Sequence, residues 1–305
     1  MTGDELHLFF EDFVSELHAR GVVCAITSGL ACVHYGIAET TKDCDLLCHP
    51  SSFSTLLNYL EETKIDGLAC HYRGNISPPL DLRWHRGGWT SHFQWDNEPE
   101  PTKLDIFGFA LRQSSPWFDE VSGKYASENI VAEMKRTDRD KDWPFIDSLG
   151  TTMLHRGDPR GWLHIFESEK IPELLSEYEI PAEILILRPA LALAKENDPF
   201  LRGALQVERQ LWQELDRLRI RICRVALRPF VLAMGRVKIP ANAALSQQHE
   251  QRLQCAEDFL AQNPVGQYGV DRMIEEAREA TAALMNPKLL QWLPDVRPHF
   301  KMYEE

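Results

Sequence analysis

Hydrophobic residues in the first third of the chain change their spacing several times, and each change predicts a different element. Over residues 5–20, apolar side chains recur every three or four positions, which predicts an amphipathic helix that ends at Gly21. The apolar run that follows directly, 22–26, predicts a strand. The next expected elements are a tight turn, a short helix, a second strand and a longer helix, at 27–29, 30–35, 42–47 and 53–62.

Further apolar runs in the middle of the chain predict more strands. Residues 67–73 and 79–84 are two of them, and 103–109 is a third that contains a single acid, Asp105. Between them, aromatic residues surround Gly87 and Gly88 in the segment 84–95, which predicts a hairpin. Its tryptophans would either stack on a nucleobase or, as we expect, pack onto the domain that carries them.

Beyond about residue 160 the pattern is almost entirely helical. Gly150, Gly157, Asp158 and Pro159 stand where the pattern changes, so we expect a domain boundary there. The sequence thus predicts an α+β domain over 1–150 and an α-helical domain over 151–305. Prolines separate the helices expected at 171–179, 181–195, 200–233, 245–262, 268–285 and 287–293.

Two acids in the strand expected at 42–47 stand out as candidate ligands. In a strand, residues i and i+2 point to the same face, so Asp43 and Asp45 would present two carboxylates together. Paired carboxylates suit Mg²⁺, which also binds substrate phosphates. Asp105 is a candidate for the third ligand, because a lone carboxylate inside an apolar strand is costly unless it is paired or bound to metal.

Together these features resemble the nucleotidyltransferase fold of the DNA polymerase beta superfamily, and most of all the AbiEii-type bacterial nucleotidyltransferases. The residues that carry the resemblance are Gly29, Gly36, Thr41, Asp43 and Asp45, followed by the later strand acid Asp105. The resemblance implies a mixed β-sheet flanked by helices, with Mg²⁺ or Mn²⁺ held by Asp43, Asp45 and Asp105. It also implies that these acids are catalytic, and that the protein is a toxin–antitoxin component.

The activity implied is transfer of an NMP from an NTP, such as ATP, to a hydroxyl or phosphate acceptor on RNA, protein or a small molecule. The nucleotide would contact the Ser28–Gly29 turn, whose backbone N–H groups can bind phosphate, together with Thr41 and Lys42. A second family signature adds Lys135 to this nucleotide site. The same signature matches the sequence at Arg139, Lys141, Asp142 and Asp147, although such charges also form ordinary surface ion pairs.

An alternative is a binding or regulatory module that has kept the fold and lost catalysis. Two departures from the family pattern favour it: Ser28 stands where Gly is usual, and Glu39 stands where Arg is common. Glu39 would repel a phosphate group, whereas Ser28 could still donate its hydroxyl to one. All three aspartates are present, and we therefore expect an enzyme.

Charge and composition limit the classes of partner and the cellular locations that we expect for this protein. The net charge is −13, with 13 Lys and Arg against 24 Asp and Glu in residues 1–150, which argues against a non-specific nucleic-acid binder. No apolar run is long enough to span a membrane, and no signal-peptide pattern follows Met1. The seven cysteines predict free buried thiols and a reducing, cytoplasmic location.

A row of arginines interrupts the acidic character of the chain. Arg217, Arg221, Arg224 and Arg228 share one face of the helix expected at 200–233. This face could contact tRNA or another nucleic acid. We expect instead that it docks onto the acidic first domain.

Overall fold

The computed structural model describes residues 2–196, 198–240 and 242–304, and its first half is built around a mixed β-sheet. The sheet has seven strands in the order β5-β6-β7-β2-β1-β9-β8. The strands are β1 (Cys24–Thr27), β2 (Cys44–Cys48), β5 (His71–Tyr72), β6 (Thr90–Trp95), β7 (Thr102–Phe107), β8 (Val121–Ser122) and β9 (Tyr125–Ala126), with a separate two-stranded ribbon of β3 (Lys64–Ile65) and β4 (Leu68–Ala69). This arrangement confirms the predicted α+β class.

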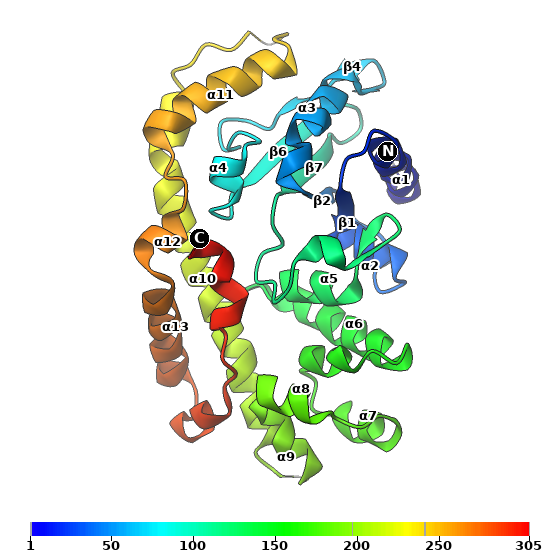
Figure 1. Cartoon of the computed structure of the whole chain (residues 1–305), viewed down its shortest axis with the longest axis vertical. Coiled ribbons are helices and arrows are strands. Elements are labelled where there is room, and N and C mark those ends of the chain that lie inside the picture. Colours follow the sequence, from blue (N-terminus) through cyan, green and yellow to red (C-terminus); the bar gives the residue numbers. More distant parts are fainter. Residues whose placement is uncertain (1, 197, 241, 305) are drawn as a thin grey trace.

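One face of the sheet is covered by two helices, α1 (Gly3–Ala19) and α3 (Phe53–Glu62) (Figure 1). The apolar stripe of α1 carries Phe9 and Phe13, whose rings lie 6.1 and 6.4 Å from the ring of Trp95 in β6. Phe13 also contacts Tyr59 of α3, with ring centroids 4.9 Å apart. Side chains alternate between the two faces along a strand. The strand residues next to those that face α1 and α3, as Trp95 does, therefore point to the opposite face of the sheet.

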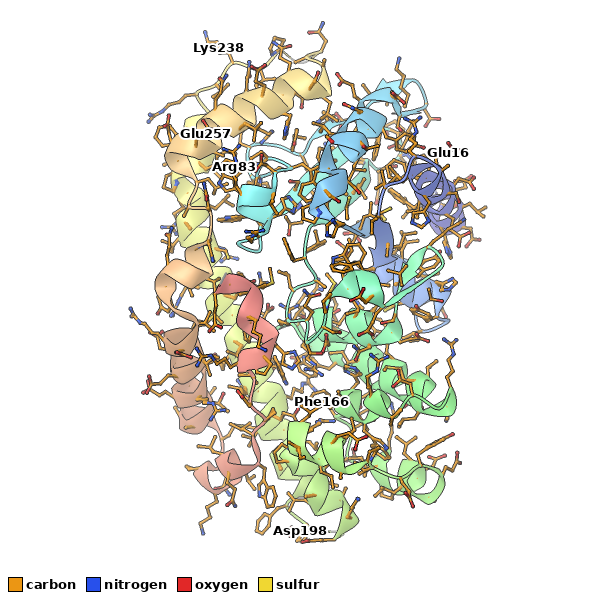
Figure 2. All side chains as sticks on the ribbon, in the orientation of Figure 1. Glu16, Arg83, Phe166, Asp198, Lys238 and Glu257 are labelled. Atoms are coloured by element: carbon orange, nitrogen blue, oxygen red, sulfur yellow. The ribbon has the colours of Figure 1, made fainter. Side chains whose placement is uncertain are left out.

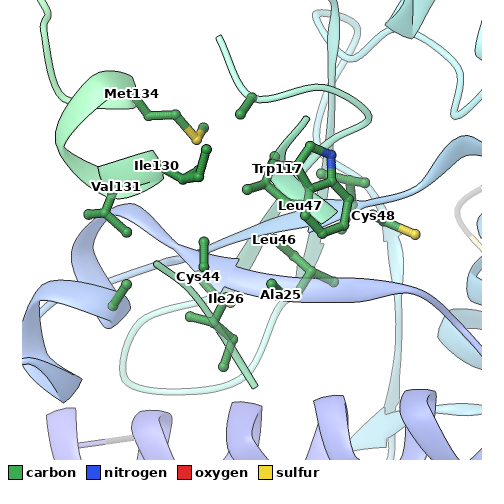
Figure 3. Packing of buried hydrophobic residues seen from close by; sticks show 14 of the residues in the cluster. Ala25, Ile26, Cys44, Leu46, Leu47, Cys48, Trp117, Ile130, Val131 and Met134 are labelled. Atoms are coloured by element: carbon green, nitrogen blue, oxygen red, sulfur yellow. The ribbon is translucent and has the colours of Figure 1, made fainter. Parts of the chain in front are cut away.

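Three helices of the first half lie close to their predicted places, namely α1, α3 and α2 (Ser28–His34). The other helices of this half are α4 (Leu82–His85), α5 (Glu128–Met134) and α6 (Trp143–His155). α2 lies between β1 and the loop that leads to β2, and it contacts α5. Figure 3 shows the core where β1, β2 and α5 meet, with Ile26, Leu46 and Met134 among the buried side chains.

In the second half, the regular elements among the described residues are all helical, as the sequence predicts, but the helix expected at 181–195 is divided by a 3₁₀ turn at Pro189–Leu191. The helices are α7 (Ile171–Glu177), α8 (Ala182–Leu187), α9 (Ala192–Lys195), α10 (Leu201–Met234), α11 (Leu245–Phe259), α12 (Pro264–Tyr268) and α13 (Val270–Leu284), with 3₁₀ turns at Pro287–Trp292 and Arg297–Tyr303. At 34 residues, α10 is about 50 Å long, and α11, α12 and α13 pack along it (Figure 1). Pro229 lies inside α10, although prolines were expected to end the helices.

The sheet and the C-terminal helices share their largest hydrophobic core. This core joins sheet residues such as Leu46 and Ile106 to Leu211 and Leu215 of α10 and to Phe300 near the C-terminus. A second core lies among α7 to α10, and a third lies between the α4 region, α10 and α11. A surface ion pair also links α4 to α11: Arg83 Nη1 lies 2.9 Å from Glu257 Oε1 (Figure 2).

Around residue 150, where a domain boundary was expected, two helical segments pack closely against each other. α6 crosses residue 150, and a Cβ atom on Gly150 would lie 2.8 Å from the carbonyl oxygen of Gly161. Gly161 makes the reciprocal approach to the carbonyl of Gly150, at 2.4 Å. Close helix contact therefore explains both glycines, and the division of the chain at residue 150 stays a prediction.

The predicted aromatic hairpin over 84–95 is wrong, as is the strand over 79–84. Residues 82–85 form the short helix α4, and only 90–95 form a strand. Trp84 and Trp89 are buried in the third core, where their indole N–H groups donate to the carbonyls of Leu260 and Ala261 at 3.1 and 2.8 Å. These tryptophans anchor the first half of the chain to α11 and offer no stacking surface to a base.

The expectation that the arginine row docks onto the first domain is also wrong. Arg217, Arg221, Arg224 and Arg228 are all exposed, and Arg217 and Arg221 pair with Glu214 of α10 and Glu276 of α13 at 2.5 and 3.5 Å. The buried side of α10 carries the docking contact instead. There Asp216 accepts from Arg112 Nη1 at 2.7 Å, and both side chains are buried.

Two other expectations concern cysteines and membranes. All seven cysteines are free, and six of them are buried, as predicted. None of the helices in the described part of the chain combines the length and the apolar content needed to cross a bilayer.

Candidate functional site

The register between two neighbouring strands brings two of the predicted acids together. β2 and β7 are parallel, and Asp45 lies opposite Asp105 in their ladder. Side chains at paired positions point to the same side of the sheet, so both carboxylates lie on the face opposite α1 and α3. On the other side of β7, the antiparallel strand β6 places His92 opposite Asp105. All three side chains are half-buried.

The surroundings of Asp45 oppose its ionisation. Burial and the neighbouring charges of Asp105 and Asp43 raise its pKa to about 7, against the lowering effects of a hydrogen bond with the Ser28 side chain and the charge of Lys135. The contributions of Asp105 and Asp43 show that the three acids lie close enough to influence one another. Asp43 lies two residues before Asp45, just outside β2, and is also half-buried.

Asp105 has the opposite character, because it has two basic neighbours. Arg73 Nη2 lies 2.7 and 3.1 Å from its two carboxylate oxygens, and His92 Nδ1 lies 2.9 Å from Oδ1. Although burial opposes ionisation, the hydrogen bond with His92 and the charges of His92 and Arg73 together lower the pKa of Asp105. At neutral pH the site thus holds one firmly ionised carboxylate beside one that titrates.

The turn between β1 and α2 is packed against the loop that carries Asp43. A Cβ atom on Gly29 would lie 2.5 Å from Thr41 Oγ1, so only glycine allows this approach. Thr41 Oγ1 in turn donates to Asp43 Oδ1 at 3.3 Å. Ser28 has φ +55°, in the left-handed region that glycine adopts freely and that residues with a side chain rarely adopt.

Lys135 approaches the acids from the end of α5. Thr27 Oγ1 donates to the sulfur of Met134 at 3.4 Å, which holds this end of the helix beside β1. Lys135 is buried, with Nζ 3.5 Å from Asp142 Oδ1, and its charge lowers the pKa of Asp45. The structure therefore gathers Ser28, Gly29, Thr41, Asp43, Asp45, Asp105 and Lys135 around one end of β2.

Compared with family models, curated proteins and solved structures, the chain matches none of them. No family is therefore assigned, and the nucleotidyltransferase resemblance remains an expectation.

Other residues from the predicted site lie elsewhere. Lys42 is exposed and pairs with Glu100, with Nζ 3.3 Å from Oε1. Asp147 accepts the backbone N–H groups of Phe166 and Glu167 at 2.7 and 2.8 Å, which is a structural role. Arg139 pairs with Asp142 at 2.7 Å, and Lys141 is exposed. The ion pairs of Lys42 and Arg139 and the hydrogen bonds of Asp147 are thus made with residues other than the three acids.

The three acids are also less tightly grouped than a loaded metal centre would be. Among the described residues, the one group of three whose ligand atoms all lie within 4.8 Å of one another is His7, Glu11 and His34, on other elements. Repulsion between the carboxylates and the ion pair of Asp105 with Arg73 both oppose closer convergence.

Sequence reasoning missed Arg73 and His92. His92 had a usable signal, because the alternating pattern of β6 puts it on the face shared with Asp105 once the strand is paired with β7. The hairpin predicted over 84–95 did not treat residues 90–95 as one strand of the sheet, so this alternation was not used. Arg73 follows the two-residue strand β5 and reaches Asp105 only through the order β5-β6-β7, which the local sequence does not indicate.

Proposed function

We propose that this protein is a metal-dependent nucleotidyltransferase that moves an NMP from an NTP to a hydroxyl or phosphate acceptor. The observation that carries the proposal is the pairing of Asp45 with Asp105 across β2 and β7, with Asp43 close enough to help raise the pKa of Asp45. The proposal includes a nucleotidyltransferase-like arrangement of the sheet and membership of the resembled family. It also includes a role in a toxin–antitoxin system, which rests on the resemblance alone.

The donor set fits Mg²⁺ or Mn²⁺. Asp43, Asp45 and Asp105 offer only carboxylate oxygens, the ligands that hard divalent cations prefer. Burial and, next to it, repulsion from Asp105 and Asp43 raise the pKa of Asp45 to about 7, and a bound cation would relieve that repulsion. Bound by these residues, the metal would supply positive charge to stabilise the phosphates during transfer.

Residues of the chain itself would perform the remaining tasks. Asp105 stays ionised because its pKa is lowered, and it would help to deprotonate the attacking hydroxyl as the bond from the α-phosphate to pyrophosphate breaks and pyrophosphate leaves. Backbone N–H groups of the Ser28–Gly29 turn and the Ser28 hydroxyl can donate to phosphate oxygens. Lys135 adds a buried positive charge nearby. Seven free thiols suit a reducing compartment, which supports a cytoplasmic setting for the reaction.

A second candidate function is an inactive nucleotide-binding or regulatory module. It is favoured by the ion pair between Arg73 and Asp105, which places a fixed side-chain cation where the third metal-binding carboxylate is needed. Glu39, exposed in the loop before Thr41, adds negative charge on the approach to the same site. In this alternative the fold would bind an NTP without transferring any part of it.

The test is a transfer assay with NTPs labelled on the α-phosphate, Mg²⁺ or Mn²⁺, and RNA, protein or small-molecule acceptors. Loss of label transfer in Asp45→Asn, with full activity in the exposed-turn control Asp66→Asn, supports the enzyme. Lys135→Met should weaken NTP binding about tenfold, which corresponds to about 1.4 kcal/mol, whereas Lys42→Met should leave it unchanged.

Binding measurements separate the two candidates when transfer is absent. Metal-dependent NTP binding without transfer to any acceptor would favour the inactive module. Calorimetry that detects no NTP binding, with or without Mg²⁺, would refute both candidates. Transfer that persists in Asp45→Asn would show that the chemistry occurs elsewhere on the protein.

A further inference from the structure

A second group of ligand-type side chains lies away from the three aspartates. His7 and Glu11 lie one turn apart on α1, and His34 is the last residue of α2. One ligand atom from each of the three lies within 4.8 Å of the other two. Three elements that are distant in the sequence thus converge here, because Tyr125 of β9 contacts all three side chains.

Tyr125 holds this group together through its ring and its hydroxyl. The His34 ring is stacked on the Tyr125 ring, with centroids 3.7 Å apart and planes 10° from parallel. The Tyr125 hydroxyl oxygen lies 2.6 Å from His7 Nε2, and the hydroxyl donates to Glu11 Oε1 at 2.6 Å. That hydrogen bond lowers the pKa of Glu11, so its carboxylate is ionised at neutral pH. Tyr125 therefore holds the three ligand-type side chains near one another.

The geometry of the first two ligands matches a small tetrahedral cation. His7 Nε2 and Glu11 Oε1 are 3.5 Å apart. Bonds of about 2.0–2.2 Å to Zn²⁺ place two ligands of a tetrahedral site about 3.3–3.6 Å apart. His34 is exposed, so rotation of its side chain can close the remaining distance. The same exposure leaves a path from solvent.

We propose that His7, Glu11 and His34 form a binding site for a divalent transition metal of the Zn²⁺ class. Two imidazole nitrogens and one carboxylate are the ligands of zinc sites that keep a position for water, and imidazole disfavours Mg²⁺ and Ca²⁺ relative to Zn²⁺. The site is separate from the one proposed for nucleotidyl transfer, since it shares no residue with it. The proposal therefore does not depend on that function.

The consequence for the fold is a metal clamp between α1, α2 and β9. α1 covers the sheet, and α2 begins at the Ser28–Gly29 turn and ends at His34. A metal bound to both helices would stabilise the folded chain, because the unfolded chain lacks the assembled site. Without metal binding, the same side chains would form only a hydrogen-bonded cluster around Tyr125.

The test is a titration of the tag-free full-length chain with Zn²⁺ by calorimetry, and with Co²⁺ by visible absorption. One metal per chain is expected in addition to any held by the aspartates, with the absorption of a four-coordinate Co²⁺ ion. His34→Gln and Glu11→Gln should each weaken Zn²⁺ binding at least about tenfold, since replacement of mere outer-shell partners already costs 10–100-fold. The matched control Glu16→Gln, at an exposed position on the same helix, should bind normally.

Two further measurements make the outcome decisive. Zn²⁺ should raise the melting temperature of the wild type and of Asp45→Asn, but not that of His34→Gln. Melting of the metal-free variants, compared with the wild type, shows that they are folded. Absence of Zn²⁺ and Co²⁺ binding, or binding that survives both His34→Gln and Glu11→Gln, would overturn the proposal, while loss of nucleotidyl transfer alone would not affect it.

Discussion

Arg73 holds the carboxylate of Asp105, with Nη2 2.7 Å from Oδ1, on the face of the sheet that also carries Asp45. Both partners are largely buried, with 24% and 16% of their side chains exposed. The hydrogen bond and charge of His92, together with Arg73, lower the pKa of Asp105 and keep it ionised beside a second carboxyl. These basic neighbours explain why the two aspartates, although paired in register, differ in pKa.

Removal of this guanidinium should destabilise the protein at neutral pH. In Arg73→Met the pKa of Asp105 should rise, and the free energy of unfolding at pH 7 should fall by about 1–3 kcal/mol, since a buried carboxylate loses a charged hydrogen bond. A lowered pKa contributes stability above the unfolded value, near 4, and that stability is lost as the pH falls through the folded pKa. The difference should therefore shrink below pH 4.

Urea unfolding of wild type and variant at pH 7 and pH 3, with NMR titration of the carboxyl carbons, measures both effects. Arg83→Met is the matched control, because Arg83 pairs with Asp81 and Glu257 at an exposed site and should cost less than about 1 kcal/mol. An unchanged pKa of Asp105 in Arg73→Met would contradict the interpretation.

Asp45 should make the stability of the protein decrease as the pH rises from about 4 to 7. Its folded pKa of about 7 lies above the unfolded value, so its contribution is full below the unfolded pKa and is lost as the pH rises through the folded pKa. Asp45→Asn removes this loss. At pH 7.5 the variant should be more stable than the wild type by a few kcal/mol, at about 1.4 kcal/mol per pKa unit.

The measurement is denaturant unfolding at pH 4 and pH 7.5, with Asp66→Asn as an exposed control that should change neither value. Mg²⁺ should raise the melting temperature of the wild type at pH 7.5 and leave that of Asp45→Asn unchanged. If Asp45→Asn were less stable than the wild type at pH 7.5, the carboxyl would be ionised without cost and the proposed crowding of charges would be wrong.

The elements that position the site could be predicted because their signals are local. The helical spacing before Gly21 and the apolar runs around Asp45 and Asp105 predicted α1, β2 and β7 within a few residues. The two acids could be assigned to one face because alternation is a property of any strand. Their place in neighbouring strands was implied only by the family resemblance, since no local pattern specifies the partner of a strand.

The misassigned parts depend on contacts between residues far apart in the sequence. Trp84 and Trp89 donate to carbonyls more than 170 residues away, and the local sequence, in which Gly87 and Gly88 predict a hairpin, does not indicate such contacts. Helical spacing placed Arg217 and Arg221 on one face correctly, but spacing alone does not show which face is covered. The buried acid Asp216, on the side of α10 that packs on the first half, was the better indicator of docking.

Gly29 should be intolerant of any side chain because of its approach to Thr41. In Gly29→Ala the new methyl group would lie 2.5 Å from Thr41 Oγ1, and the resulting shift should cost about 1–3 kcal/mol of unfolding free energy. Thr41→Ala creates the missing space, so the double variant should recover most of this loss. A double-mutant cycle measured by thermal unfolding gives the coupling directly. Additive effects of the two substitutions would refute the contact.

Arg112 and Asp216 should couple the stability of the two halves of the chain. Arg112 Nη1 lies 2.7 Å from Asp216 Oδ1, and both side chains are almost fully buried, at 3% and 1% exposure. Arg112→Met leaves the buried carboxylate with Arg219 and the backbone N–H of Asp138 as its remaining partners. Loss of one member of such a pair costs about 3–5 kcal/mol.

Calorimetric melting distinguishes a shared core from two independent domains. Because the sheet and α10 contribute to the same hydrophobic core, Arg112→Met should lower one cooperative transition of the whole chain. Arg209→Met, which removes an exposed pair between α10 and Asp140, is the control and should cost less than about 1 kcal/mol. Two separate transitions, of which the variant shifts only one, would instead show that residues 1–150 and 151–305 fold independently.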